Sequence, residues 1–164
     1  MEIRLINEQD DCFAISNVYE ESWKSAYKGI IPQTYLDSIP KGHWVKFLND
    51  STWNTLIMLD GDTVIGTSSY GKSRFADMND YGEIISIYLL PEYLGKGYGK
   101  QLLQAAIDDL IQMGYKDIFL YVLETNAKTR YFYEQFGFKA SSVYLDDDIG
   151  GKRLREIQYV YHAE

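Results

Sequence analysis

The feature that most restricts the fold of this chain is a long apolar run, followed by a glycine-rich turn and then by a helical pattern. The run Ile84–Leu90 is almost continuously apolar, as expected of a β-strand covered on both faces, and Pro91 ends it. From Gly99 the apolar residues recur at helical spacing until Gly114. The sequence therefore predicts a buried strand, a tight turn and an amphipathic helix in direct succession.

The turn has the composition of an anion-binding site. Gly95, Gly97 and Gly99 allow close approach to the backbone, and the first N–H groups of the following helix have no acceptor within that helix. Lys96 and Lys100 add positive charge. We therefore expect the turn to bind a phosphate group.

Two well-known phosphate motifs do not fit the spacing of this turn. A Walker A loop has four residues between its glycines and then Lys followed by Ser or Thr, whereas three residues separate Gly95 from Gly99, and Gln101 follows Lys100. The Rossmann fingerprint reads G-x-G-x-x-G after the first strand of its fold. Here G-x-G-x-G follows at least three β-type runs, and no acidic residue closes the next strand.

The rest of the chain mixes helical and β-type patterns. Asp10 or Asp11 can cap a first helix, whose apolar residues begin with Phe13 and which ends near residues 27–29. Further helices are expected at about 32–36, 44–48, 99–113 and 127–136, and strands at 2–6, 55–59, 63–70, 83–90, 118–123, 138–145 and 155–162. Asp60-Gly61-Asp62 predicts a hairpin turn, and residues 146–151 a second turn. This order predicts an α/β fold in which three antiparallel strands lead into a β-α-β unit.

Composition excludes several classes of protein. The chain has 164 residues and no visible internal boundary, so we expect a single domain over 1–164. Its net charge of −8 disfavours nucleic acid as a partner on electrostatic grounds, and one cysteine with two histidines allows neither an intramolecular disulfide nor a zinc cluster. No signal peptide or membrane-spanning stretch is apparent, so we expect a cytoplasmic protein with no membrane partner.

At the glycine turn the sequence resembles the GNAT acyltransferases, whose signature is Gln or Arg, two residues, Gly, any residue, then Gly or Ala, between a strand and a helix. Residues 94–99, LGKGYG, match its glycines, and Leu94 replaces the Gln or Arg. Residues 126–138 resemble the second cofactor motif of the family, and residues 23–37 resemble a bacterial subgroup without known substrates. The resemblance is clearest over 62–138 and weaker over nearly all the rest.

This resemblance implies the GNAT fold: a mixed, mostly antiparallel sheet of six to seven strands, splayed at the fourth strand and flanked by about four helices. It also implies acetyl-CoA as the cosubstrate and no metal. The pantetheine arm would bind the main chain of the fourth strand, the pyrophosphate the amides of the turn, and two side chains near the second motif would approach the arm and thiol. The cofactor-binding residues would be Ile87, Tyr88, Leu89, Leu90, Gly95, Lys96, Gly97, Tyr98, Gly99, Lys100, Asn126 and Tyr133.

Two residues match catalytic positions of the family. Direct transfer requires a neutral amine, whereas a lysine-like amine with a pKa of about 10.4 is protonated at pH 7. Glu83 is expected to accept the proton, directly or through water, and Tyr133 to protonate the CoA thiolate. A solvated carboxylate at a strand end and a core aromatic are the alternatives for these two residues. The N–H of Leu89 would polarise the thioester carbonyl.

The acceptor site is expected on the early helical segments, where the family varies its substrates. Its candidate residues are Trp23, Tyr27, Tyr35, His43 and Trp44. Helix-spaced aromatic residues are also common in cores, so packing is the alternative for this set. The negative charge favours a cationic amine of a small molecule or peptide as acceptor, and the resemblance implies a homodimer.

Three functions follow from these patterns. The first is an N-acetyltransferase that works by direct attack in a ternary complex. The second is a catalytically inactive acyl-CoA-binding sensor or interaction module, which the missing Gln or Arg at Leu94 favours. The third is a phosphate-loop nucleotidase.

Overall fold

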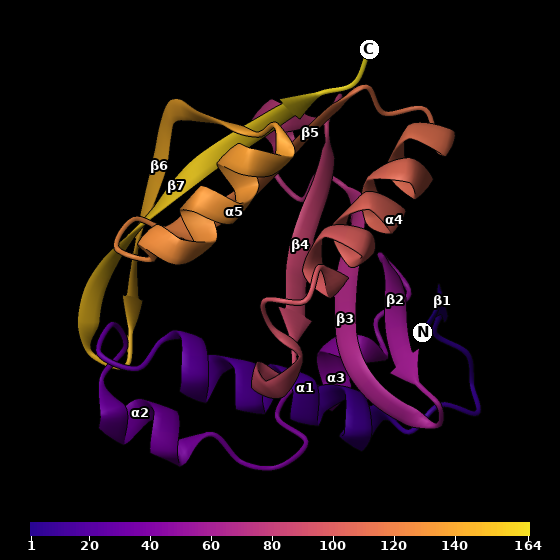
Figure 1. Cartoon of the computed structure of the whole chain (residues 1–164). Helices are drawn as coiled ribbons and strands as arrows, with labels where there is room; N and C mark the ends of the chain where they lie inside the picture. Colours follow the sequence, from indigo (N-terminus) through magenta and orange to yellow (C-terminus); the bar gives the residue numbers. More distant parts are fainter.

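A single seven-stranded sheet organises the molecule (Figure 1). The computed structural model describes all 164 residues, and the strand order is β1-β2-β3-β4-β5-β7-β6. The strands are β1 (Glu2–Leu5), β2 (Asn54–Asp60), β3 (Thr63–Lys72), β4 (Gly82–Leu89), β5 (Asp117–Leu123), β6 (Lys139–Ile149) and β7 (Lys152–His162). The helices are α1 (Cys12–Ala26), α2 (Gln33–Ser38), α3 (Val45–Leu48), α4 (Tyr98–Gln112) and α5 (Ala127–Phe136), with 3₁₀ turns η1 (Ala76–Met78) and η2 (Pro91–Tyr93).

The strand pairing is antiparallel except at one position. Strands β1 to β4 form an antiparallel series, and β5, β7 and β6 form a second one. Strand β4 pairs with β5 in parallel, because α4 carries the chain back to the N-terminal end of β4 before β5 begins. The predicted α/β fold, with three antiparallel strands leading into a β-α-β unit, is confirmed.

The sheet has two arms, of which strands β1 to β4 form the first and strands β5, β7 and β6 the second. Helices cover both faces of the first arm. Along β2, Leu56 and Met58 belong to the core cluster that contains the buried stripe of α4, whereas Ile57 packs with Ile15 and Tyr19 of α1. Because successive side chains of a strand point to opposite faces, α1 and α4 lie on opposite sides of the sheet. In Figure 1, α5 lies over the β5-β7-β6 arm on the same side as α4.

Several sequence predictions are confirmed in detail. The Asp11 side chain caps α1 by accepting from the N–H of Phe13 at 2.9 Å. Gly61, with φ +59°, forms the turn of the β2-β3 hairpin, and Gly137 caps α5 as predicted. No helix has the length and apolar character needed to cross a bilayer.

Three local predictions are wrong. Phe13 is 61% exposed instead of lying in the core stripe of α1, because it covers Gly42 on the surface. The turn predicted over 146–151 is shorter, because β6 extends to Ile149, and Asp146 of β6 pairs with Arg155 across the ladder. The middle of β4 is half-buried instead of covered on both faces, because one of its edges is open.

Candidate active site

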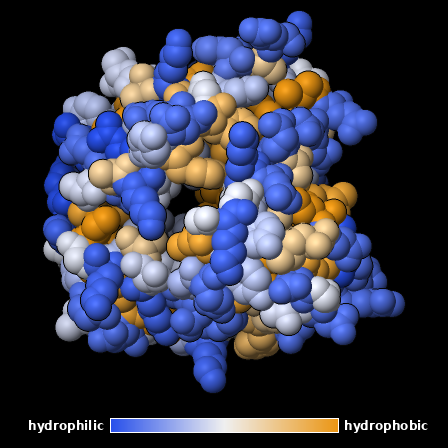
Figure 2. Space-filling view, in the orientation of Figure 1, coloured by the Kyte–Doolittle hydropathy of each residue, from blue (hydrophilic) through white to orange (hydrophobic).

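The candidate site is the place where β4 and β5 separate. Only two residue pairs, Gly82–Ile118 and Glu83–Phe119, join these strands, and both strands continue beyond them. Past Glu83 the edge of β4 has no partner strand. The space-filling view shows a hollow in the surface between the two arms of the molecule (Figure 2). The predicted splay at the fourth strand is therefore confirmed.

The main chain at the open edge of β4 is oriented for hydrogen bonding. The N–H of Leu90 donates to the carbonyl oxygen of Ile65 in β3 at 2.8 Å, and Leu89 lies opposite Gly66. In an antiparallel ladder this makes Gly66–Leu89 a non-hydrogen-bonded pair. The N–H groups of Leu89 and of Ile87, two residues earlier, therefore point away from β3 towards the space between the arms.

The glycine turn lies directly after this open edge. Gly95 and Gly97 have φ values of +75° and +87°, where other residues are strained, and α4 begins at Tyr98. None of the six N–H groups from Gly95 to Lys100 donates a hydrogen bond within the chain. Leu94 is 47% exposed beside them. Six amides at a helix N-terminus form a site that fits a phosphate or pyrophosphate group.

Helix α5 brings Asn126 and Tyr133 towards the core from the second arm. The Asn126 side-chain oxygen caps α5 by accepting from the N–H of Thr129 at 3.3 Å, so its NH₂ group remains available as a donor. The Tyr133 phenol has no hydrogen-bond partner in the chain, although the residue is only 6% exposed. Burial, and secondarily the nearby Tyr88, raise the pKa of Tyr133, so the phenol keeps its proton at neutral pH.

A second phenol joins the open edge of β4 to α1. The hydroxyls of Tyr27 and Tyr88 lie 3.2 Å apart. Burial is the main cause that raises the pKa of Tyr27, to about 12, and the charges of Tyr133 and Glu156 add to it. Tyr27 and Tyr88 therefore meet between the end of α1 and the open edge of β4, and Tyr133 and Glu156 lie close enough for their charges to affect Tyr27.

Glu83 lies where the two strands part, and its carboxylate is already engaged. Arg74, in the loop after β3, donates to one oxygen through its main-chain N–H and Nε at 3.1 Å each, and to the other through Nη2 at 2.7 Å. Glu83 is 1% exposed. It is therefore a buried, paired carboxylate instead of a solvated strand end, and a proton added to it would weaken its charge-assisted bonds to Arg74.

The structure brings most of the predicted acceptor residues together. The Trp23 ring contacts those of Tyr27 and Trp44, at centroid distances of 4.9 Å and 5.3 Å. Tyr35 packs against the same cluster, which joins α2 to the β6-β7 arm. His43 is exposed, and its ring contacts this group only through the ring of Trp44.

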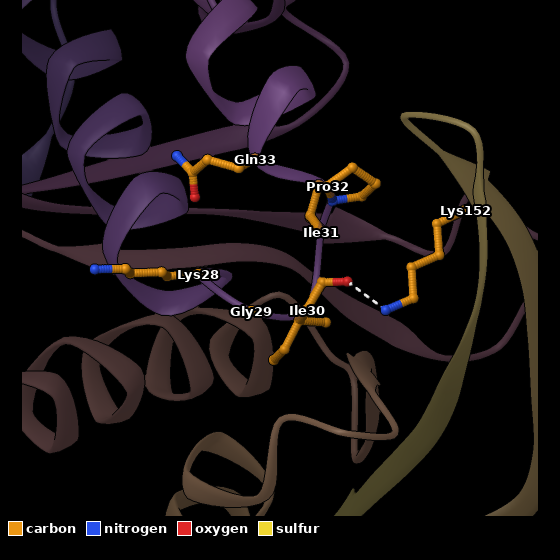
Figure 3. A pocket seen from close by; sticks show the side chains of 7 residues that line it. All are labelled: Lys28, Gly29, Ile30, Ile31, Pro32, Gln33 and Lys152. Atoms are coloured by element: carbon orange, nitrogen blue, oxygen red, sulfur yellow. Dashed lines mark hydrogen bonds between the residues drawn. The ribbon is translucent and has the colours of Figure 1, made fainter.

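Two adjoining cavities open beside this aromatic group. One, of about 430 Å³, lies at the turn after α1, where Lys152 Nζ donates to the carbonyl oxygen of Ile30 at 3.1 Å (Figure 3). The other, of about 580 Å³, extends between Glu124 and the β6-β7 hairpin. Residues 28–33, within one of the segments predicted to bind the acceptor, line the first cavity together with Lys152, whereas the second is lined mainly by residues of the β6-β7 hairpin. None of the five predicted acceptor residues lines either cavity, and the glycine turn lies apart from both. No cluster of His, Cys, Asp or Glu side chains in the structure is arranged to hold a metal ion.

Sequence reasoning missed three residues of this region. The Ser22 Oγ donates to the carbonyl oxygen of Leu89 at 2.6 Å, Arg74 holds Glu83, and Glu156 lies near Tyr27. Only Glu156 carried a usable signal. Glu156 lies two residues after the apolar Leu154 in the last strand, so the two side chains share one face of it. Leu154 is buried against α2, which makes that face the inward one.

The comparisons with known proteins agree with this geometry. The model of the acetyltransferase (GNAT) family matches residues 14–138. The chain belongs to this family. An uncharacterised N-acetyltransferase, YuaI, of Bacillus subtilis is 32% identical over 151 residues, which cover 90% of this chain and 86% of the relative. A spermidine N(1)-acetyltransferase of Thermoplasma acidophilum is 27% identical over 92% of each chain.

The solved structures give the same result for the GNAT fold. The PaiA N-acetyltransferase of Thermoplasma acidophilum, in complex with coenzyme A, has a TM-score of 0.74, with 26% identity over 99% of each chain. Family membership makes this chain an acetyltransferase that uses acetyl-CoA as its acetyl donor. The expectations of fold, activity and cosubstrate are therefore confirmed.

Proposed function

We propose that this GNAT enzyme transfers the acetyl group of acetyl-CoA to a primary amine of a small molecule or peptide, by direct attack in a ternary complex. The observation that carries the proposal is the open edge of β4. It presents main-chain donors next to the glycine turn, and Tyr88 of the same strand contacts Tyr27, which belongs to the aromatic cluster of predicted acceptor residues. A donor and an acceptor molecule can therefore approach the same edge from different sides.

The chain has suitable groups for each part of coenzyme A. The six unpaired amides from Gly95 to Lys100 would hold the pyrophosphate, with Lys96 and Lys100 exposed beside them. The outward main chain from Ile87 to Leu90 would bind the pantetheine arm as an added strand. The Asn126 NH₂ group would donate to the same arm. Acetyl-CoA supplies the activated acetyl group.

Two groups would act on the thioester end. The outward N–H of Leu89 would donate to the carbonyl oxygen as negative charge develops there. Tyr133 would donate to the sulfur as the C–S bond breaks, since its buried phenol is protonated at neutral pH. Transfer to a thiolate of pKa about 8.5 is uphill from this phenol, so it must be coupled to bond cleavage.

The acceptor would enter through the cavities beside α1, α2 and the β6-β7 hairpin. Trp23, Tyr27 and Trp44 would form the apolar wall, with Tyr35 and His43 further out. Among relatives, the spermidine acetyltransferase acts on a polyamine, and a [ribosomal protein bS18]-alanine N-acetyltransferase of Haemophilus influenzae, 32% identical over half of this chain, acts on a protein. The net charge of −8 favours a cationic acceptor.

Release of free thiol from acetyl-CoA tests the proposal. The purified chain is assayed with polyamines, aminoglycosides and peptides that carry a free amine. We expect amine-dependent thiol release with at least one class, and a mass increase of one acetyl group on that amine. Binding of acetyl-CoA without release above hydrolysis for every amine would overturn the proposal and favour the inactive acyl-CoA sensor.

A further inference from the structure

Glu156 is the one half-buried acidic residue that lacks a partner within the chain. Six Asp or Glu residues are buried or half-buried, and five of them accept a hydrogen bond from another side chain or the main chain or pair with a cation. The five are Asp10, Glu20, Glu83, Asp109 and Asp117. No group in the chain donates to the Glu156 carboxylate. Because an unpaired, partly buried carboxylate is costly, Glu156 is a candidate for binding a cation from outside the chain.

Its position places this carboxylate on the acceptor side of the site. Glu156 lies on β7, between Leu123 of β5 and Leu145 of β6. Its neighbour of the same face, Leu154, packs against α2 and also lines the larger cavity. The Glu156 side chain therefore faces α1 and α2, where the acceptor is proposed to enter.

The charged and titratable groups around Glu156 come from four segments. Burial and the charge of Asp147 on β6 raise the pKa of Glu156, whereas Arg74 of the β3-β4 loop lowers it. The charge of Glu156 in turn raises the pKa of Tyr27 on α1 and of Tyr121 on β5. Glu156 thus lies within electrostatic reach of Tyr27, whose hydroxyl is 3.2 Å from that of Tyr88 on the open edge of β4.

Glu83 is less suited to take up a proton. Both of its oxygens accept from Arg74, and the residue is 1% exposed. Glu156 has free acceptor positions, and Leu154 on the same face of β7 lines the larger cavity. We propose that Glu156, and not Glu83, binds the ammonium group of the acceptor and accepts its proton. This inference rests on the proposed function.

In the proposed reaction the ammonium nitrogen loses two protons. One N–H bond of the ammonium breaks, and an O–H bond forms on Glu156. The neutral amine then forms the new C–N bond while the C–S bond breaks, and Tyr133 protonates the leaving sulfur. The second proton lost by the amine nitrogen restores Tyr133 through solvent, and Glu156 releases its proton to solvent. One proton is thereby released for each amide formed.

The pH dependence of kcat/KM for the amine, at saturating acetyl-CoA, tests this role. The wild type should be nearly independent of pH between the pKa of Glu156 and that of the amine, which is about 10.4 for a lysine-like group. Glu156→Gln can use only amine that is already neutral. Its kcat/KM should rise tenfold per pH unit, from a deficit of about 10²- to 10⁴-fold at pH 7 to a few-fold near pH 10.

Three variants complete the experiment. Glu156→Asp should restore part of the wild-type profile, and Glu8→Gln, which removes the same charge from an exposed site, should leave it unchanged. Glu83→Gln should lower the rate without changing the shape of the profile. Equal affinity for coenzyme A in all variants, measured by calorimetry, shows that they are folded.

The outcomes separate the two proposals. A Glu156→Gln profile parallel to that of an active wild type overturns the role of Glu156 and leaves the proposed function standing. A tenfold rise per pH unit in Glu83→Gln instead assigns the proton to Glu83 and also overturns it. A wild type that acetylates no amine overturns the proposed function, and the role of Glu156 with it.

Discussion

The hydroxyl of Tyr27, the residue that caps the C-terminus of α1, lies 3.2 Å from the Tyr88 hydroxyl of β4. This contact joins the helix that lines the proposed acceptor site to the strand whose open edge is proposed to bind the acetyl donor. Both phenols have raised pKa values, chiefly because they are buried. They therefore remain neutral donors and acceptors over the pH range in which the amine loses its proton.

The first prediction concerns alkaline stability. The pKa of Tyr27 is raised to about 12, above the ordinary value of 10.0. Between these values the unfolded chain has lost a proton that the folded chain retains, so the free energy of unfolding falls as pH rises. For this group the fall in the free energy of unfolding is at most about 1.4 kcal/mol per pH unit. Below pH 10 the stabilisation that Tyr27 contributes through its raised pKa is fully present.

Tyr27→Phe should make this fall shallower. The measurement is the urea midpoint at several values from pH 9 to pH 11, and the slope against pH is the readout, because loss of the bond to Tyr88 shifts the midpoint at every pH. Tyr131→Phe is the matched control, since Tyr131 is 63% exposed. Identical slopes for the wild type and Tyr27→Phe would contradict the prediction.

The second prediction concerns the proposed acid. Tyr133→Phe should lower kcat by about 10²-fold, because the leaving sulfur loses its proton donor, and should change KM for acetyl-CoA little. The unpaired hydroxyl of Tyr133 makes no bond within the chain, so its removal should not weaken the fold. Steady-state kinetics and a thermal melt measure both effects. An unchanged kcat would return Tyr133 to the role of a core aromatic.

The third prediction concerns Ser22, which fixes the carbonyl group of Leu89 from α1. Ser22→Ala leaves a buried carbonyl oxygen without its donor, which should cost about 1–3 kcal/mol of stability. We also expect weaker binding of coenzyme A, because the same peptide segment carries the outward N–H groups. Calorimetry and thermal melts measure these quantities.

Ser38→Ala is the control for Ser22→Ala. The Ser38 Oγ donates to the carbonyl oxygen of Tyr35 at 2.6 Å, the same distance and geometry type, but at an exposed position away from β4. It should change the affinity for coenzyme A little and stability less than Ser22→Ala. Equal effects of the two substitutions on affinity would show that Ser22 has no special link to the open edge.

The elements of this fold were predictable because their signals are local. Asp11 caps α1, Gly137 ends α5, and the pair Asp60–Gly61 turns the β2-β3 hairpin, each within a few residues of the apolar pattern it bounds. The turn over 146–151 was misjudged because three consecutive aspartates resemble a loop. The first of them, Asp146, pairs with Arg153 and Arg155 of the neighbouring strand, and that cross-strand pairing is not visible in a linear pattern.

The site was predictable only in its main-chain part. The glycine turn and the strand before it are contiguous, so the six free amides follow from a short stretch of sequence. Three side chains reach the site from elsewhere in the chain. Ser22 and Glu156 come from segments that are distant in sequence from β4, and Arg74 comes from a loop whose path depends on the fold. Glu156 is recognisable from the sequence only as a charged residue that alternates with Leu154 along the last strand. The partners of all three residues are set by the splay of β4 from β5, which no local pattern encodes.

The last prediction concerns Leu94, where the GNAT signature has Gln or Arg. Leu94 is 47% exposed next to the six free amides, so Leu94→Arg can place a guanidinium beside the bound pyrophosphate without disturbing the core. We expect the affinity for coenzyme A to rise by up to about tenfold at low salt, as one charge-assisted hydrogen bond of 1.4 kcal/mol or more allows, and the gain to shrink at high salt. Met113→Arg, at the other end of α4 and 46% exposed, adds the same charge away from the turn and should leave the affinity nearly unchanged. Equal gains from both variants would show that only the net charge matters, and no gain from either would mean that the amides alone hold the pyrophosphate.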